Sequence, residues 1–90
     1  MKKQLFNKII ETFGTEPVSD TQGIYIKVLL HPDDSIAIYF INADNIKEDL
    51  QKRNYRWERL LHAWVKHVAT IEEALAETEG YPTTAAALGR

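Results

Sequence analysis

Two neighbouring segments of high β-propensity constrain the fold of this chain most, because both are apolar on two faces. Residues 23–31 (GIYIKVLLH) and 35–42 (SIAIYFIN) are separated by a Pro-Asp-Asp turn, and this pattern predicts a β-hairpin. Alternation places one apolar set on a single face: Ile24, Ile26, Val28, Leu30, Ile36, Ile38 and Phe40. The other face carries Tyr25, Leu29, Tyr39 and Ile41. A hairpin with two apolar faces and two open edges is not stable alone, so helices must cover it or another chain must extend it.

The N-terminal segment supplies one helix. Its apolar residues recur at helical spacing: Leu5, Phe6, Ile9, Ile10 and Phe13. Gly14 and Pro17 follow as stop signals, so we predict an amphipathic helix over residues 2–13. Residues 14–23 (GTEPVSDTQG) consist of turn-forming types and predict a loop.

The C-terminal half of the chain has a heptad pattern that predicts a long helix. Asn45 and Glu48 have the spacing of a capping box, which places the helix start near Ile46. Seam positions then recur at alternating intervals of four and three residues: Leu50, Asn54, Trp57, Leu61, Trp64, Val68, Ile71 and Leu75. A continuous helix to Thr78 would have about 33 residues and a length of about 50 Å. That length exceeds the width of about 26 Å expected for a compact domain of this size.

Two positions could divide this helix. Asn54 is a residue type that ends helices, with a restart at Tyr55, and Thr70 and Glu73 have the spacing of a second capping box. Because the heptad register continues through both positions, we favour one long helix or two nearly collinear helices. The seam would pack on the chain's own hairpin and first helix, or on the seam of a second subunit, with Asn54 setting the register.

These elements predict an α+β fold with an N-terminal helix, a β-hairpin and a long, straight or kinked, C-terminal helix packed on the sheet. A chain of 90 residues is long enough for one domain and too short for two independent cores. We therefore assign residues 1–80 to a single α-β-β-α domain. Residues 81–90 form a short C-terminal tail, in which Thr83 or Thr84 could start one turn of helix.

Composition indicates a cytoplasmic protein. The chain has no cysteine, which excludes disulfides and thiolate metal sites and fits a reducing compartment. Lys8 and Glu11 interrupt the first apolar run, so we predict neither a signal peptide nor a membrane-spanning segment. The net charge of −2 argues against general binding to nucleic acid or to an anionic membrane.

Residues 54–68 (NYRWERLLHAWVKHV) combine aromatic and basic side chains, as nucleic-acid-binding helices do. On a helix, however, the tryptophans face the seam, and the basic residues form a row on the opposite side. That separation disfavours a stacking surface for single-stranded nucleic acid, which needs both on one surface. The row and its neighbours are still candidate contacts to a partner or to phosphate groups: Lys52, Arg53, Tyr55, Arg56, Arg59 and Lys66.

We predict no catalytic, cofactor-binding or metal-binding residue. His62 and His67 are five positions apart, so they diverge on a helix, and His31 precedes a Pro-Asp-Asp sequence of ordinary turn composition. The sequence has no cysteine nucleophile, no serine within a His–acid pattern and no glycine-rich phosphate loop.

These observations favour a small non-enzymatic interaction protein, a regulator or inhibitor that binds another protein and forms a homodimer. The identity of the protein partner is not encoded in any motif. The alternative is a nucleic-acid-binding accessory protein that uses the basic row. We expect no cofactor and no membrane association.

Overall fold

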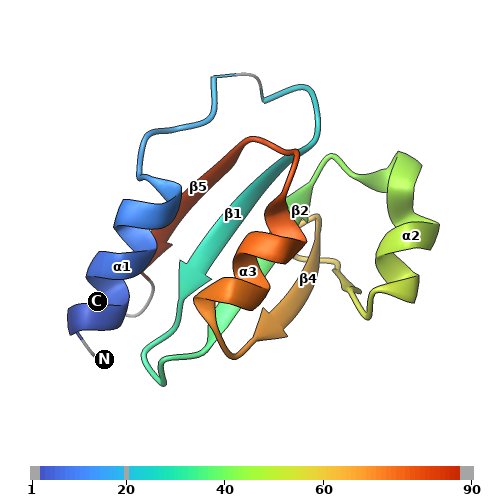
Figure 1. The fold of residues 1–90 in the computed structure, drawn as a ribbon. Coiled ribbons are helices and arrows are strands. Elements are labelled where there is room, and N and C mark those ends of the chain that lie inside the picture. Colours follow the sequence, from blue (N-terminus) through green and yellow to red (C-terminus); the bar gives the residue numbers. More distant parts are fainter. Residues whose placement is uncertain (1–2, 20, 88–90) are drawn as a thin grey trace.

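The computed structural model describes residues 3–19 and 21–87, which form an α+β fold with one mixed sheet (Figure 1). Within these residues the sheet has five strands, accompanied by three α-helices and one short 3-10 helix. The elements in chain order are α1 (Lys3–Phe13), β1 (Tyr25–Leu30), β2 (Ile36–Ile41), η1 (Asp44–Ile46), α2 (Lys47–Lys52), β3 (Arg56–Glu58), β4 (Ala63–Val68), α3 (Ile71–Thr78) and β5 (Thr83–Ala87). The predicted α+β class and the N-terminal helix are confirmed.

The predicted hairpin forms the centre of a larger sheet. β1 and β2 pair antiparallel, with Val28 opposite Ile38. The strand order is β3-β4-β2-β1-β5, in which β4 continues the antiparallel pairing on one side and β5 adds a parallel strand on the other. The chain itself therefore extends the hairpin at both edges.

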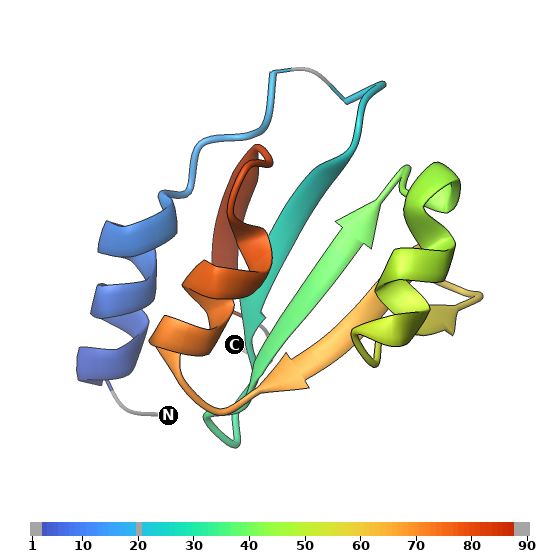
Figure 2. The ribbon, with the colours of Figure 1, turned by 45° about the vertical axis from the view of Figure 1, so that its right-hand side comes forward.

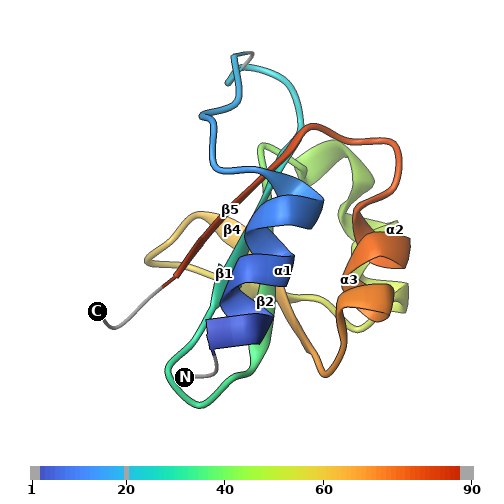
Figure 3. The ribbon, with the colours of Figure 1, turned by 60° about the vertical axis from the view of Figure 1, so that its left-hand side comes forward.

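The three α-helices lie on the same side of the sheet (Figures 2 and 3). The core lies between these two layers, and its central strand residues are those that alternation placed on one face: Ile26, Val28, Leu30, Ile36, Ile38 and Phe40. Residues of the three α-helices complete the core: Ile9 of α1, Leu50 of α2, and Ile71 and Ala74 of α3. The buried face of the hairpin was thus predicted correctly.

The predicted long C-terminal helix is wrong. Residues 50–75 contain the end of α2, the strands β3 and β4 and the start of α3 instead. After α2, Asn54 takes a left-handed conformation with φ of 72°, which asparagine tolerates better than most residues. Residues 59–62 connect β3 to β4, and His62 there has φ of 51°.

The heptad spacing fails as a helix signal because the same residues satisfy the pairing of two antiparallel strands. Trp57 on β3 lies opposite Trp64 on β4, so both indoles project to the helix-covered face. Val68 follows Trp64 by four residues, which is an even number, so it also lies on that face. A spacing of four residues is therefore compatible with one face of a strand as well as with one face of a helix.

α3 begins where the second capping box was predicted. Thr70 Oγ1 accepts a hydrogen bond from the Glu73 amide at 3.1 Å, and Thr70 has extended backbone angles, as an N-cap residue should. α3 has only 8 residues, however, because Gly80 at φ of 89° and then Pro82 end the helical run. The first predicted capping box is wrong, since no side-chain hydrogen bond caps α2 within the described residues.

Residues Thr83–Ala87 form the strand β5 and not the turn of helix that the sequence suggested. β5 pairs parallel with β1, with Ala85 opposite Val28. The Ala85 amide also donates a hydrogen bond to the Gly14 carbonyl at 2.8 Å, which ties β5 to the end of α1. Small alanine side chains allow α1 to pack closely against this strand.

Replacing Thr70 with alanine removes the N-cap acceptor of α3, and we expect the free energy of unfolding to fall by about 1 kcal/mol. Chemical denaturation followed by tryptophan fluorescence measures this change. Thr15→Ala, at an exposed position in the loop after α1, is the matched control and should change stability by less than about 0.5 kcal/mol. Equal stability of Thr70→Ala and wild type would show that α3 does not depend on this cap.

Candidate interaction surfaces

A carboxylate between the helix layer and the sheet binds three side chains that the sequence suggested as partner contacts. Glu77 Oε1 accepts hydrogen bonds from Arg53 Nη2 at 2.6 Å and from Tyr55 Oη at 2.9 Å. Glu77 Oε2 accepts one from Lys66 Nζ at 2.8 Å. The side chains of Glu77 and Lys66 are 18% and 22% exposed, so this charge network is largely removed from water. We call Arg53, Tyr55, Lys66 and Glu77 the Glu77 cluster.

Aromatic rings complete the surroundings of the Glu77 cluster. The Tyr55 ring meets Phe40 edge-on, with 5.1 Å between the centroids. The Arg53 guanidinium carbon and Lys66 Nζ each lie 5.5 Å from the Tyr55 ring centroid. An aromatic ring at this distance attracts a cation, and more strongly where water is excluded. The cluster therefore joins the end of α2, the strand β4 and α3.

Electrostatics favour the ionised form of Glu77. Burial acts to raise the pKa of this carboxyl, but the hydrogen bonds from Lys66, Arg53 and Tyr55 outweigh burial and lower the pKa below its ordinary value of 4.5. Burial, followed by the hydrogen bond to Glu77, raises the pKa of Tyr55 well above its ordinary value. The Tyr55 phenol consequently stays protonated and acts as a donor.

Glu77→Gln keeps the size of this side chain but removes its charge, and we expect the free energy of unfolding to fall by about 1–3 kcal/mol near neutral pH. Because the pKa of Glu77 is lowered in the folded protein, its contribution is fully present above the unfolded value of 4.5 and is lost as the pH falls through the folded pKa. The difference between wild type and variant should therefore shrink on acidification. Urea denaturation at neutral pH and at about pH 3 measures it, and a difference independent of pH would contradict an ionised Glu77.

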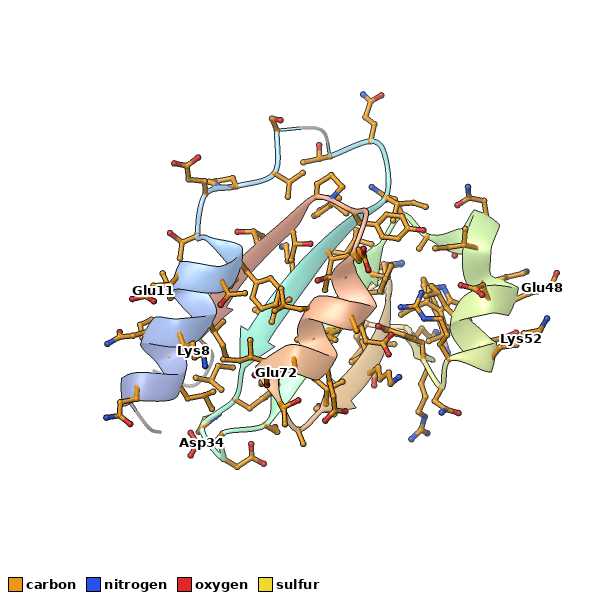
Figure 4. The ribbon with its side chains drawn as sticks, viewed as in Figure 1. Lys8, Glu11, Asp34, Glu48, Lys52 and Glu72 are labelled. Carbon is orange, nitrogen blue, oxygen red and sulfur yellow. The ribbon has the colours of Figure 1, made fainter. Side chains whose placement is uncertain are left out.

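The predicted basic row does not exist as one surface. Arg53, Tyr55 and Lys66 belong to the Glu77 cluster, and Tyr55 is only 3% exposed. The other predicted contacts are exposed and lie on α2, on β3 and in the turn after β3: Lys52 (Figure 4), Arg56 and Arg59. Sequence reasoning missed Glu77, because it stands in an acidic run with no pattern that distinguishes it from its neighbours.

The predicted helix seam is dispersed over several elements. Four of its residues enter the core from α2, β4 and α3: Leu50, Trp64, Val68 and Ile71. The other four are exposed: Asn54, Trp57, Leu61 and Leu75. A continuous helical interface is therefore not present in the part of the chain that the structure describes.

The turn between β3 and β4 exposes large apolar side chains. Leu60 is 92% exposed, Leu61 is 55% exposed and Trp57 is 44% exposed. The Trp57 ring packs against Trp64 and edge-on against His62, with centroid separations of 5.5 Å and 6.3 Å, so Trp57 is held in place while one side stays accessible. We call Trp57, Leu60 and Leu61 the hairpin tip. Three exposed large apolar side chains within residues 57–61 make this β-hairpin a candidate interaction site.

A pocket of about 440 Å³ adjoins the hairpin tip. Its lining residues come from the 3-10 helix, α2 and the two tryptophan-bearing strands: Asp44, Lys47, Gln51, Trp57 and Trp64. The Trp64 indole nitrogen is buried and has no hydrogen-bond partner among the described residues. Trp57 therefore belongs both to the hairpin tip and to this pocket, whose side toward α2 is polar.

The strand register places the second apolar set that alternation predicted on the sheet face opposite the helices. Tyr25, Leu29, Tyr39 and Ile41 are half-buried there, on β1 and β2. The register of the five strands adds further residues to the same face: Lys27, Ala37, Arg56, Glu58, Ala63, Val65, His67, Thr84 and Ala86. No helix of the described residues covers this face (Figure 3), which we call the open face.

Two histidines meet at one end of the open face. The rings of His31 and His67 lie 5.5 Å apart, and His31 Nε2 is buried with no hydrogen-bond partner in the described part of the chain. Only the strand order brings these rings together, so sequence reasoning missed the pair. Residues 3–19 and 21–87 contain no group of three or more His, Cys, Asp or Glu side chains arranged to hold a metal ion. Two imidazoles alone fall short of the four ligands of a structural zinc site.

Neither a membrane-spanning helix within residues 3–19 and 21–87 nor a known relative of the chain points to a function. None of the helices in the described residues combines the length and apolarity needed to cross a membrane. Comparison with known proteins gives no match to a protein-family model, a curated protein or a solved structure.

Proposed function

We propose that this chain is a non-enzymatic interaction protein, a regulator or inhibitor, which binds another protein through the hairpin tip. The observation that carries the proposal is the nearly complete exposure of Leu60 beside the exposed Leu61 and Trp57. A leucine that is 92% exposed contributes almost no burial to the isolated chain, so the core does not account for it.

Burial of the hairpin tip in a partner would be favourable. A large apolar side chain moved from water to an apolar pocket contributes about 1.5–3 kcal/mol, and tryptophan is among the residue types that dominate binding energies. Trp57 is already held against Trp64, so little side-chain entropy is lost when a partner binds it. Arg59 is exposed in the same turn and can pair with an acidic rim around the partner's apolar pocket.

The same tip supports a homodimer, which we include in the proposal as a state that competes with partner binding, because both bury the same side chains. A two-fold axis brings the same patch of both subunits together, so an apolar tip meets an identical apolar tip. Burial of both leucines from each subunit then supplies the driving force.

The alternative function used the predicted basic row to bind nucleic acid. This row loses its support because Arg53 and Lys66 bind Glu77 inside the fold. The exposed cations Lys52, Arg56 and Arg59 come from three different elements.

Replacing both leucines of the tip with serine, Leu60→Ser/Leu61→Ser, tests the homodimer. Both positions are exposed, so the variant should keep the wild-type stability within about 0.5 kcal/mol. We expect the wild-type mass in light scattering to rise with protein concentration and the variant to stay monomeric. Leu75→Ser, at an exposed leucine on α3, is the control and should dimerise like wild type. A wild-type protein that is monomeric at every concentration would contradict the homodimer.

Pull-down from a host lysate tests the hairpin tip as a site for another protein. Wild type and Leu75→Ser should capture the same partner, whereas Leu60→Ser/Leu61→Ser should not. A protein that all three baits capture equally would bind elsewhere on the chain, and this result would count against the hairpin tip.

A further inference from the structure

The open face presents a tyrosine between two basic side chains in one row across the sheet. Lys27 on β1 lies opposite Tyr39 on β2. Tyr39 lies opposite Val65 on β4, which in turn lies opposite Arg56 on β3. Residues paired in this way project to the same face. At about 4.8 Å per strand, the row from Lys27 to Arg56 spans about 14 Å.

Both cations of this row are available to a ligand. Lys27 and Arg56 are exposed, and neither forms an ion pair within the described residues, unlike the cations of the Glu77 cluster. Among the paired strand residues of this face, Glu58 is the acidic one, and its charge adds to the effect of burial in raising the pKa of Tyr39. The paired strand residues of the open face therefore carry two positive charges and one negative charge, although the whole chain has a charge of −2. Exposed cations that lack an internal partner are available to an anionic ligand.

The open face is hollowed on its β1–β5 side, where a pocket of about 420 Å³ is lined by Thr15 and Pro17 of the loop after α1 and by Lys27, Leu29, Thr84, Ala85 and Ala86. Ala37, Ala63 and Val65 are at most 7% exposed, so they offer a partner almost no accessible surface. The accessible apolar surface belongs to the larger half-buried side chains around them: Tyr25, Leu29, Tyr39 and Ile41. Partly accessible tyrosine rings beside exposed cations on one surface are the combination that binds single-stranded nucleic acid.

We propose that the open face binds single-stranded nucleic acid. The Tyr39 ring stacks on a base, and Lys27 and Arg56 contact phosphates on either side of it. Tyr25, on the same face of β1, offers a second ring. Bases in a duplex are stacked on each other and paired, so a site that works by stacking selects single strands.

This site is separate from the hairpin tip. Trp57 projects to the helix-covered face of the sheet, whereas its neighbour Arg56 projects to the open face. The two binding proposals therefore use different surfaces, and either can fail while the other holds.

Fluorescence anisotropy of labelled oligothymidylate and oligouridylate, each of about 12 nucleotides, tests the proposal at about 50 mM and 200 mM salt. We expect binding of at least one of them at the lower salt, weaker binding at the higher salt, and weaker binding of the same strand annealed to its complement. Absence of an anisotropy change for both oligonucleotides at about 50 mM salt, or equal affinity for strand and duplex, would overturn the proposal.

Variants of Tyr39, Lys27 and Arg56 distinguish the contribution of base stacking to the affinity from that of charge. Tyr39→Ala should lower the affinity roughly tenfold, and Tyr39→Phe should keep it within about twofold, because phenylalanine retains the stacking ring. Lys27→Ala/Arg56→Ala should reduce the slope of log affinity against log salt by about 1.4. Glu58→Gln should tighten binding, because it removes the repulsion of phosphate from this face.

The matched control removes two positive charges from the helix layer, in Lys8→Ala/Lys52→Ala (Figure 4). This variant and Leu60→Ser/Leu61→Ser should bind the oligonucleotide like wild type, and circular dichroism checks that every variant is folded. Equal losses in the Lys8→Ala/Lys52→Ala control and the open-face variants would show unspecific attraction and overturn the proposal. If no oligonucleotide binds and Tyr39→Ala changes the oligomeric state, the open face is a protein interface instead.

Discussion

The arrangement of the C-terminal half depends on the hydrogen bonds and ion pairs that the Glu77 carboxylate forms. Lys66 lies on the helix-covered face of β4, where an unpaired ammonium group would be costly, and Glu77 supplies its partner from α3. The same carboxylate holds Arg53 at the end of α2 and the Tyr55 hydroxyl. One acid thus links the end of α2 and α3 to β4 of the sheet.

This constraint also determines which side chains reach the surface. Because Lys66 projects toward the helices, Val65 and His67 on either side of it project to the open face. Pairing with β4 then places Arg56 on the open face and Trp57 on the other. The cations that first looked like one basic row are therefore divided into an internal pair that stabilises the fold and exposed groups available to partners.

The local signals of the sequence predicted α1, the β1–β2 hairpin and its buried face, because helical spacing, strand alternation and a Pro-Asp-Asp turn each depend on neighbouring residues. β3 and β4 were missed for two physical reasons. Lys66 interrupts the apolar alternation of β4, and the turn at 59–62 contains neither Gly nor Pro. Strand alternation did predict that Tyr25 and Tyr39 lie on the open face. The alignment of Lys27 and Arg56 with Tyr39 required the order of four strands, which no local pattern encodes.

Both proposed surfaces require that residues 56–68 form two paired strands, and nuclear Overhauser effects measured by NMR test this most directly. The structure predicts backbone contacts across the hairpin, between Trp57 and Trp64 and between Arg56 and Val65. A helical segment would instead give contacts between the α proton of each residue and the amide of the third residue after it. Cross-strand contacts would support the hairpin tip and the open face together, whereas a continuous helical pattern from 56 to 68 would contradict the structure of both.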